Sequence, residues 1–342
     1  MIPARADDRP RRTRPFVAAA PDAPIAPGPV PTFSIVIPAF QAASFIGEAL
    51  RSALTQTLQP REIIVCDDGS IDDLASAVAP FEDRIRFLHR PRRGVGAARN
   101  AAIEVASGDF IALLDADDVF EPERLEALGE LAAARPDLDI LGTDAYYEID
   151  GVLDGRFYDT TAFFPAQQRV GIMDACFIAA AALRRQHVLD AGGFDESLKV
   201  GEDWDLLIRL ILGGSKAGVV LEPLLRYRRH ASSATADRTE ALWSRVSVLE
   251  KTLRYPALSP EERQVLHRCL IRARSRAVLN DARALSATDA PGSRRSLLSE
   301  ARARGIAPAT RFALVYAALM PIGAATILTW AERRFRKWRV DS

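Results

Sequence analysis

Cysteine is scarce in this chain. Its 342 residues include three cysteines, Cys66, Cys176 and Cys269, which lie far apart in the sequence. An odd and scattered set predicts neither a disulfide framework nor a clustered zinc site, and it fits a reducing, cytosolic compartment. The apolar stretch 16–20 stops at Pro21, too short and too late for the core of a signal peptide, so secretion is not predicted.

Long hydrophobic runs are rare as well. One uncharged stretch, 312–331, has the length of about 20 residues that a bilayer-spanning helix needs. Pro321 and Gly323 interrupt it, and basic residues flank both of its ends, so the positive-inside rule gives no orientation. Three interpretations stay open: one membrane crossing, an interfacial helix with Trp330 and Trp338 at headgroup depth, or a buried C-terminal hairpin of helices.

The net charge is zero, but the charges are unevenly distributed. Residues 221–342 contain 23 Lys and Arg against 11 Asp and Glu, which leaves 22 against 34 for residues 1–220. An acidic half suits a metal site, and a basic tail suits an anionic surface such as lipid headgroups. Aromatic and basic residues are not interleaved as they are in nucleic-acid-binding modules, so no nucleic-acid partner is expected.

The N-terminal segment differs in composition from the rest of the chain. Residues 1–31 contain eight prolines and five arginines with little apolar periodicity, which predicts a disordered arm before an ordered fold that starts at Phe33. We expect an α/β domain over residues 32–235. A helical and basic C-terminal region should follow over 236–342, with 312–331 as its candidate membrane-associated segment.

From Phe33 onward, short apolar runs alternate with helical patterns. This alternation is typical of a mostly parallel central sheet with helices on its faces. The predicted strands are 34–37, 62–66, 85–89, 110–114 and 138–142, and the predicted helices between them are 46–54, 96–106 and 122–134. Farther along, the Ala-rich stretch 176–189 predicts another helix.

Clusters of acidic residues follow two of the predicted buried strands. One is Asp67-Asp68, and the other is the run 115–118, with the sequence DADD. Like charges this close are costly unless they are neutralised, and carboxylate oxygens suit a hard divalent ion such as Mg or Mn. Because ligands bind beyond the carboxyl ends of parallel strands, we expect both clusters and residues 38–40 on one rim. The alternative for 115–118 is a solvated turn that caps the next helix.

A third acidic group opens a later helix. The sequence Gly201-Glu202-Asp203-Trp204-Asp205 precedes an apolar helical face. Carboxylates in the first turn of a helix are favoured by its dipole, so a capping role is the alternative to a chemical one.

Six motifs occur in a fixed order between Phe33 and about His230. They are SIVIPAF at 34–40, IVCDDGS at 64–70, GVGAARN at 94–100, DADD at 115–118, GGFDE at 192–196 and GEDWDL at 201–206. In order and spacing the set resembles the family 2 glycosyltransferases. The resemblance implies a GT-A fold over 32–235, a nucleotide-sugar donor, a divalent metal, and inverting transfer of the sugar to an acceptor hydroxyl.

On the donor side, the resemblance assigns residues that bind the nucleotide. Asp68, and less directly Asp67, would accept hydrogen bonds from the base. The base would pack on a floor formed by Pro38, Ala39 and Phe40, with ordinary core packing as the alternative for Phe40. Gly94 and Gly96 would let the backbone approach the donor closely.

The resemblance also assigns the metal side. Asp117 matches the metal-binding residue, and Asp115 matches the residue that supports the ribose and the metal. His230 resembles a further ligand in some relatives, and a surface histidine beside three arginines is its alternative. Arg99 contacts a phosphate or pairs with a carboxylate, and the sequence does not choose between these. The expected cofactor is Mn or Mg.

Inverting transfer needs one general base that takes the proton of the acceptor hydroxyl. Asp203 matches the second position of the family's Glu-Asp pair and is the predicted base, with Glu202 as its neighbour and orienter. Trp204 would either pack beside the acceptor sugar or fill the core.

Departures from the family pattern narrow the function further. The Gln-x-x-Arg-Trp motif and the several strong membrane spans of processive polysaccharide synthases are missing, which favours addition of a single sugar. Residues 144–170 match no pattern, so the acceptor and the sugar cannot be named. We expect a UDP-sugar donor, a sugar or lipid-linked acceptor, and a place at the cytosolic face of a membrane in surface polysaccharide or glycoconjugate synthesis.

Two other functions were weighed against this prediction. A nucleotidyltransferase would carry a Gly-rich first loop followed by Arg and Lys, which residues 38–42 lack. A non-catalytic nucleotide-sugar-binding scaffold of the same fold remains the alternative.

Overall fold

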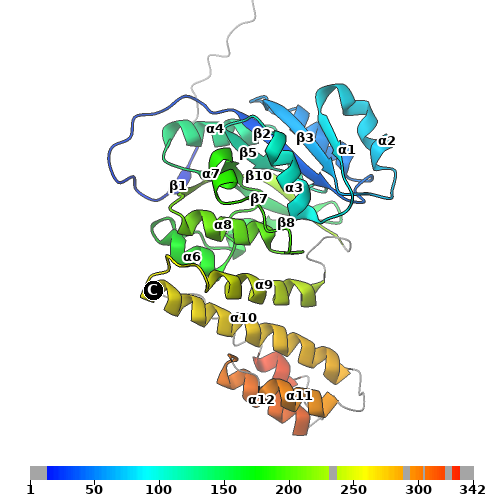
Figure 1. Cartoon of the computed structure of the whole chain (residues 1–342), viewed down its shortest axis with the longest axis vertical. Coiled ribbons are helices and arrows are strands. Elements are labelled where there is room, and N and C mark those ends of the chain that lie inside the picture. The colour runs from blue at the N-terminus through cyan, green and yellow to red at the C-terminus, as the bar shows by residue number, and fades with distance from the viewer. Residues whose placement is uncertain (1–13, 231–236, 288–292, 303–304, 320–325, 332–342) are drawn as a thin grey trace, which may run out of the picture.

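The centre of the molecule is a ten-stranded sheet. The computed structural model describes residues 14–230, 237–287, 293–302, 305–319 and 326–331. The strands lie in the order β1-β10-β7-β9-β5-β2-β3-β4, with β6 added to β10 and β8 added to β7. Figure 1 shows the sheet flanked by helices, with further helices stacked away from it toward the C-terminal region.

Four adjacent parallel strands form the half of the sheet that the sequence predicts best. They are β4 (Arg86–His89), β3 (Glu62–Asp67), β2 (Phe33–Ala39) and β5 (Phe110–Leu113). Both faces of β2, β3 and β5 are covered, which explains their continuous apolar sequences. The expectation of a mostly parallel sheet is confirmed. The helices that accompany these strands are α1 (Ile46–Leu54), α2 (Leu74–Val78), η1 (Ala79–Arg84), α3 (Val95–Val105) and α4 (Arg124–Ala134).

The other half of the sheet is longer and less regular. Here β7 (Ile140–Ile149) runs parallel to β10 (Ala217–Arg229), and their pairing is the most extensive in the molecule. Two short strands pair antiparallel with them: β6 (Val119–Phe120) with β10, and β8 (Val152–Arg156) with β7. The chain then passes through α5 (Phe157–Thr160), η2 (Pro165–Gln167) and α6 (Gln168–Asp174).

The Ala-rich stretch 176–189 is not the single helix that its composition predicts. Instead β9 (Ala182–Arg184) lies between β5 and β7 and pairs antiparallel with both, and α7 (Arg185–Asp190) follows it. A strand at this position joins the two halves of the sheet, and its ladder hydrogen bonds override the helix propensity of alanine. Ala182 is fully buried there.

Order also begins earlier than Phe33. β1 (Phe16–Ala18) pairs antiparallel with β10, and Arg14 forms ion pairs with Glu126 and Glu222. The edge of β10 offers unpaired backbone groups, which a short extended segment can satisfy even when it has little apolar surface. β1 thus lies within the stretch 1–31 that the composition predicts to be disordered, and residues 1–13 lie outside the described part of the chain.

The C-terminal helices share a core with the sheet. α9 (Arg238–Thr252) and α10 (Pro260–Ala287) pack with α6 and α8 (Glu202–Leu212), so that Val248, Leu249 and Leu266 join the same apolar cluster as Leu207. Lys251 of α9 forms ion pairs with Asp195, at 2.6 Å, and with Asp205 of α8, at 2.8 Å. The residues on the two sides of the predicted boundary between 235 and 236 therefore belong to one apolar core.

A separate apolar cluster lies at the far end of α10. It joins α10 to α11 (Ser293–Ala301), α12 (Pro308–Leu319) and residues 326–331, with Leu314 and Leu328 fully buried. Over the described ranges, no helix is both long enough and apolar enough to cross a membrane. Residues 320–325, in the middle of the stretch 312–331, lie outside those ranges, as does Trp338. At the described ends of the stretch, Leu314 and Leu328 are buried, whereas Phe312 and Trp330 are exposed.

Candidate active site

The carboxyl ends of β2 and β3 hold the two aspartates of the first acidic cluster in fixed positions. Asp67 accepts hydrogen bonds from the Ser70 backbone N–H at 2.8 Å and from His89 Nδ1, also at 2.8 Å. Burial raises the pKa of Asp67, but the hydrogen bonds from Ser70 and His89 outweigh burial and leave the pKa below its usual value.

Asp68 fastens the loop that leads into α3. Its two oxygens accept the backbone N–H groups of Arg93, at 2.9 Å, and Gly94, at 2.7 Å. Gly94 has a φ of 101°, a conformation that favours glycine. The carboxylate is 3% exposed, so its first task is to hold this loop against the end of β3.

The predicted base floor lies beside this loop. Ala39 is buried, and Phe40 is half-buried with the Arg92 guanidinium 3.9 Å from its ring centroid. The Phe40 ring is thus a rim feature rather than a core residue, and it follows directly on Pro38 and Ala39 at the end of β2. Gly96 lies elsewhere: a Cβ at this position would come within 3.4 Å of Phe194, so its small size lets α3 pack on the 192–196 turn.

Arg99 joins two of the motifs. Its guanidinium binds Asp115 Oδ1 at 2.6 Å and also donates to Glu202 at the start of α8. The structure therefore resolves the sequence alternatives for Arg99 in favour of carboxylate pairing. Burial lowers the pKa of Arg99, and the charges of Asp115 and Glu202 raise it further than burial lowers it. For Glu202, burial raises the pKa against the opposing effect of Arg99.

Asp117 and His230 are brought together from positions 113 residues apart. Asp117 Oδ2 lies 2.9 Å from His230 Nε2, and the imidazole stacks on Phe45 with ring centroids 4.7 Å apart. Burial and the charge of Asp115 raise the pKa of Asp117, against the hydrogen bond from His230. His230 therefore lies at the acidic rim beside Asp117, where a metal-binding role is possible on geometric grounds.

This pair is compatible with a divalent ion that also binds a diphosphate. A carboxylate and an imidazole are ligands that Mn accepts, and ions held with substrate phosphates often take only one or two protein ligands. In the described ranges, no group of three or more His, Cys, Asp or Glu side chains has a metal-binding arrangement. Asp117 and His230 would therefore fit an ion that takes its remaining ligands from the phosphates of a bound donor.

Asp118 has a different environment from its neighbours in the 115–118 run. Its side chain is buried, Oδ1 accepts the Arg228 backbone N–H at 2.9 Å, and burial raises its pKa well above the usual range. The fully buried Arg124 lies nearby, stacked on Phe120 and donating to the carbonyl oxygen of Ala180 at 2.7 Å. Asp118 therefore anchors β10 to the rim, a role that the sequence does not distinguish from that of Asp117.

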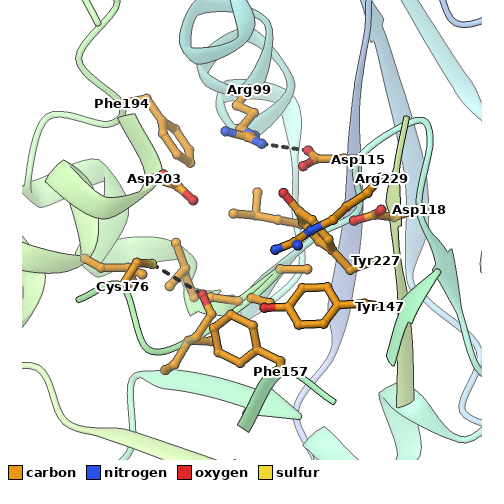
Figure 2. A pocket seen from close by; sticks show the side chains of 17 residues that line it. Arg99, Asp115, Asp118, Tyr147, Phe157, Cys176, Phe194, Asp203, Tyr227 and Arg229 are labelled. Atoms are coloured by element: carbon orange, nitrogen blue, oxygen red, sulfur yellow. Dashed lines mark hydrogen bonds and ion pairs between the residues drawn. The ribbon is translucent and has the colours of Figure 1, made fainter. Parts of the chain in front are cut away.

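Asp203 opens into a pocket of about 330 Å³. It lies in the first turn of α8, after Gly201 with a φ of 82°, and its Oδ1 accepts the Trp204 backbone N–H at 2.7 Å. Figure 2 shows Asp203 and Asp115 on opposite sides of the pocket, with Arg99 between them. Asp203 is exposed to the pocket, but the protein around its carboxylate keeps part of the solvent away and raises its pKa, while Arg99 opposes this and Asp115 adds to it.

Neither Trp204 nor Glu202 is among the residues that line the pocket. Trp204 is 5% exposed, and its indole N–H donates to the carbonyl oxygen of Ile172 at 2.6 Å. Of the two interpretations of Trp204, the structure supports core filling, because α8 needs a large apolar side chain against α6. Glu202 is buried in its ion pair with Arg99.

The opposite wall of the pocket is formed by residues that the sequence analysis did not identify. Tyr147, Phe157, Tyr227 and Arg229 line it, together with Cys176 and an apolar floor over 178–181. One signal was present in the sequence: Tyr227 and Arg229 are two apart on a strand, so they share a face. Long-range strand pairing brings β7, α5 and β10 together. Such pairing cannot be predicted from a local motif.

Comparison with known proteins agrees with this geometry. Residues 34–193 match the family described as Glycosyl transferase family 2. Succinoglycan biosynthesis protein ExoO of Rhizobium meliloti (strain 1021) is 30% identical over 260 residues, which cover 70% of this chain and 73% of that protein. Hyaluronan synthase of Pasteurella multocida is 31% identical over 185 residues, which are 53% of this chain and 19% of the synthase, so the chain spans about a fifth of that protein's length.

Solved structures share the fold at lower identity. S. aureus TarS 1–349 in complex with UDP-GlcNAc matches with a TM-score of 0.63 and 19% identity, over 91% of this chain and 94% of that one. Mannosyltransferase PcManGT from Pyrobaculum calidifontis, in complex with GDP-Man and Mn2+, matches with a TM-score of 0.54 and 20% identity, over 90% of each chain. The motif order, the sheet with its acidic rim and these relatives together place the chain in the family 2 glycosyltransferases, with the GT-A fold.

Proposed function

We propose that the protein is a metal-dependent, inverting glycosyltransferase that moves one sugar from a nucleoside-diphosphate sugar to an acceptor hydroxyl. The observation that carries this proposal is the convergence of three motifs on one pocket. Asp115 and Asp203 face each other across it, and Arg99 links Asp115 to Glu202, the neighbour of Asp203. The Asp117–His230 pair belongs to the same acidic rim.

The nucleotide binds over the ends of β2 and β3. Phe40 with Pro38 and Ala39 supplies the surface for the base, and Asp67 and Asp68 face the same rim. Asp68 already holds two backbone N–H groups, but each carboxylate oxygen can accept a second hydrogen bond. UDP is the proposed nucleotide, which the UDP and UDP-GlcNAc complexes of S. aureus TarS support.

Asp117 and His230 hold the ion, with Mn or Mg as the candidates, and Asp115 supports the ribose side. PcManGT, which has the same fold, was solved with Mn2+. A divalent ion at this place neutralises the charge that develops on the leaving diphosphate.

Asp203 acts as the general base. Its carboxylate takes the proton of the acceptor hydroxyl while the hydroxyl oxygen attacks the anomeric carbon from the face opposite the diphosphate. A raised pKa favours this role, because a base with a pKa nearer to neutrality binds the proton more strongly. The ion pair between Glu202 and Arg99 fixes the first turn of α8, and so the direction of the Asp203 side chain.

The biological setting follows from relatives named for polysaccharide synthesis, such as ExoO and hyaluronan synthase. We place the enzyme at the cytosolic face of a membrane, where its basic C-terminal region meets anionic lipid and its acceptor is a sugar or a lipid-linked sugar. Flotation of the purified full-length protein with anionic and neutral vesicles tests this placement. Equal recovery with both kinds of vesicle would contradict it.

The first experiment on catalysis is thermal stabilisation by UDP, GDP, dTDP and CMP, each with and without Mn. A shift specific to one nucleotide and dependent on Mn is expected, because Asp117 and His230 would hold an ion that offsets the charge of the diphosphate. Binding without any transfer or donor hydrolysis would favour the non-catalytic scaffold. No shift with any nucleotide would contradict the donor site.

A further inference from the structure

Arg229 lines the pocket, and no carboxylate among the described residues pairs with it. It forms no ion pair with any residue in the described part of the chain, although Arg226 and Arg228 on the same strand each bind both Glu48 and Glu148. Its guanidinium lies over the Tyr147 ring instead, 4.1 Å from the ring centroid. Figure 2 shows the group projecting into the pocket.

The carboxylates of the pocket already have partners of their own. Asp115 is paired with Arg99, Asp118 accepts the Arg228 backbone N–H, and Asp203 accepts that of Trp204. No one of them depends on Arg229 for neutralisation. Stacking on Tyr147 occupies the face of the guanidinium and leaves the N–H groups at its edge free to donate.

The wall beside Arg229 is aromatic. Tyr147 lies edge-on to Tyr227, with ring centroids 6.0 Å apart and an interplanar angle of 86°, and 6.4 Å from Phe157. The floor is made of small apolar side chains at 178–181. Flat aromatic surfaces with a few polar groups suit a sugar ring, whose C–H faces are apolar and whose edge is polar.

We infer that this pocket binds the acceptor and that the acceptor is a sugar carrying an oxyanion, a carboxylate or a phosphate, which Arg229 holds. This inference rests on the proposed function and names the substrate class of the same site. The planar guanidinium matches either oxyanion through two parallel hydrogen bonds. Anchoring the acceptor at Arg229 leaves its hydroxyl to be presented to Asp203 across the pocket.

The test measures the affinity of the full-length protein, with saturating UDP and Mn, for glucuronate, glucose 1-phosphate and neutral glucose. We expect wild type to prefer one anionic probe over glucose. Arg229→Gln should remove this preference, with a loss of about tenfold in affinity for that probe, as expected for charge-assisted hydrogen bonds. Its affinity for glucose and for UDP with Mn should not change. Arg229→Lys should recover part of the preference, because it keeps the charge and loses the planar fork.

Arg84→Gln is the matched control. Arg84 is exposed on η1, outside the pocket lining, and the change removes the same charge, so the preference should remain. Three results would overturn the inference: no preference for either anion by wild type, equal weakening of glucose and the anion in Arg229→Gln, or weaker UDP binding in that variant. The last would assign Arg229 to the donor diphosphate. In each of the three, UDP and Mn still bind to wild type, whereas loss of that binding would contradict the proposed function itself.

Discussion

Two parts of the candidate site are built from different kinds of contact. At the proposed donor part, the aspartates that end β3 are held by backbone N–H groups, as Asp68 is by Arg93 and Gly94. At the proposed acceptor part, Tyr147 meets Tyr227 edge-on and lies under the Arg229 guanidinium, and these side chains come from the paired strands β7 and β10. Backbone contacts within one loop require particular residues at particular spacings, which become recognisable motifs. A wall of aromatic rings needs only some aromatic residue at each position. The residues of this part of the site can therefore differ between enzymes with different acceptors.

The strongest test of this comparison is Asp203→Asn. The amide keeps the shape and can still accept the Trp204 N–H, but it cannot take a proton. Turnover should fall by about 100-fold or more, while donor affinity should remain unchanged. Steady-state rates and UDP titration measure the two quantities, with Asp190→Asn on α7 as a surface control. Equal loss of donor affinity and rate would remove Asp203 from the role of base.

A smaller effect is expected at the metal side. Asp117→Ala should weaken Mn-dependent UDP binding by at least about tenfold, since even the partners of metal ligands contribute that much. The exposed Asp73, whose side chain makes no capping bond at the start of α2, gives the control Asp73→Ala. Isothermal titration with and without Mn separates the two variants. UDP binding that responds to Mn as before in Asp117→Ala would exclude the proposed ligand.

Asp68→Asn tests whether the donor side depends on loop bracing. One of its two backbone donors would then face an amide NH2, and the free energy of unfolding should fall by about 2 kcal/mol. Urea unfolding measures the change. An unchanged midpoint with weaker UDP binding would show that Asp68 serves the nucleotide and not the loop.

The smallest effect concerns pH. The hydrogen bond from Lys251 lowers the pKa of Asp195 to about 2, from an ordinary value of 3.8. Because the folded-state pKa is depressed, the contribution of this contact to stability is complete above the unfolded value of 3.8 and is lost as pH falls through about 2. The melting temperature of wild type should therefore exceed that of Asp195→Asn near neutral pH and converge with it in acid. A constant difference between the two would contradict this linkage.

The sequence predicts the residues at the strand ends better than it predicts the buried residues and the pocket wall. The parallel strands follow from apolar runs, while the GT-A fold and the roles proposed for Asp115 and Asp203 follow from the resemblance of the motifs to a family. The sequence did not predict β1, β9 or the burial of Asp118, and it did not choose between two positions for Trp204. Each of these depends on which distant segment packs alongside, as when β9 enters the gap between β5 and β7. Arg229 was missed for the same reason, because its neighbour Tyr147 comes from another strand.

Lys251 has a consequence for how such enzymes can be divided or recombined. It neutralises Asp205, a buried carboxylate on the helix that carries Asp203. α9 therefore stabilises the helix that holds the proposed base. A fragment ending near residue 235 would leave Asp205 with Arg209 alone and would strip Val248 and Leu249 from the core. The smallest fragment able to stand alone therefore includes α10. Because α10 also contributes Val278, Leu279 and Ala282 to the cluster with α11 and α12, a tail exchanged between relatives must match this face of α10.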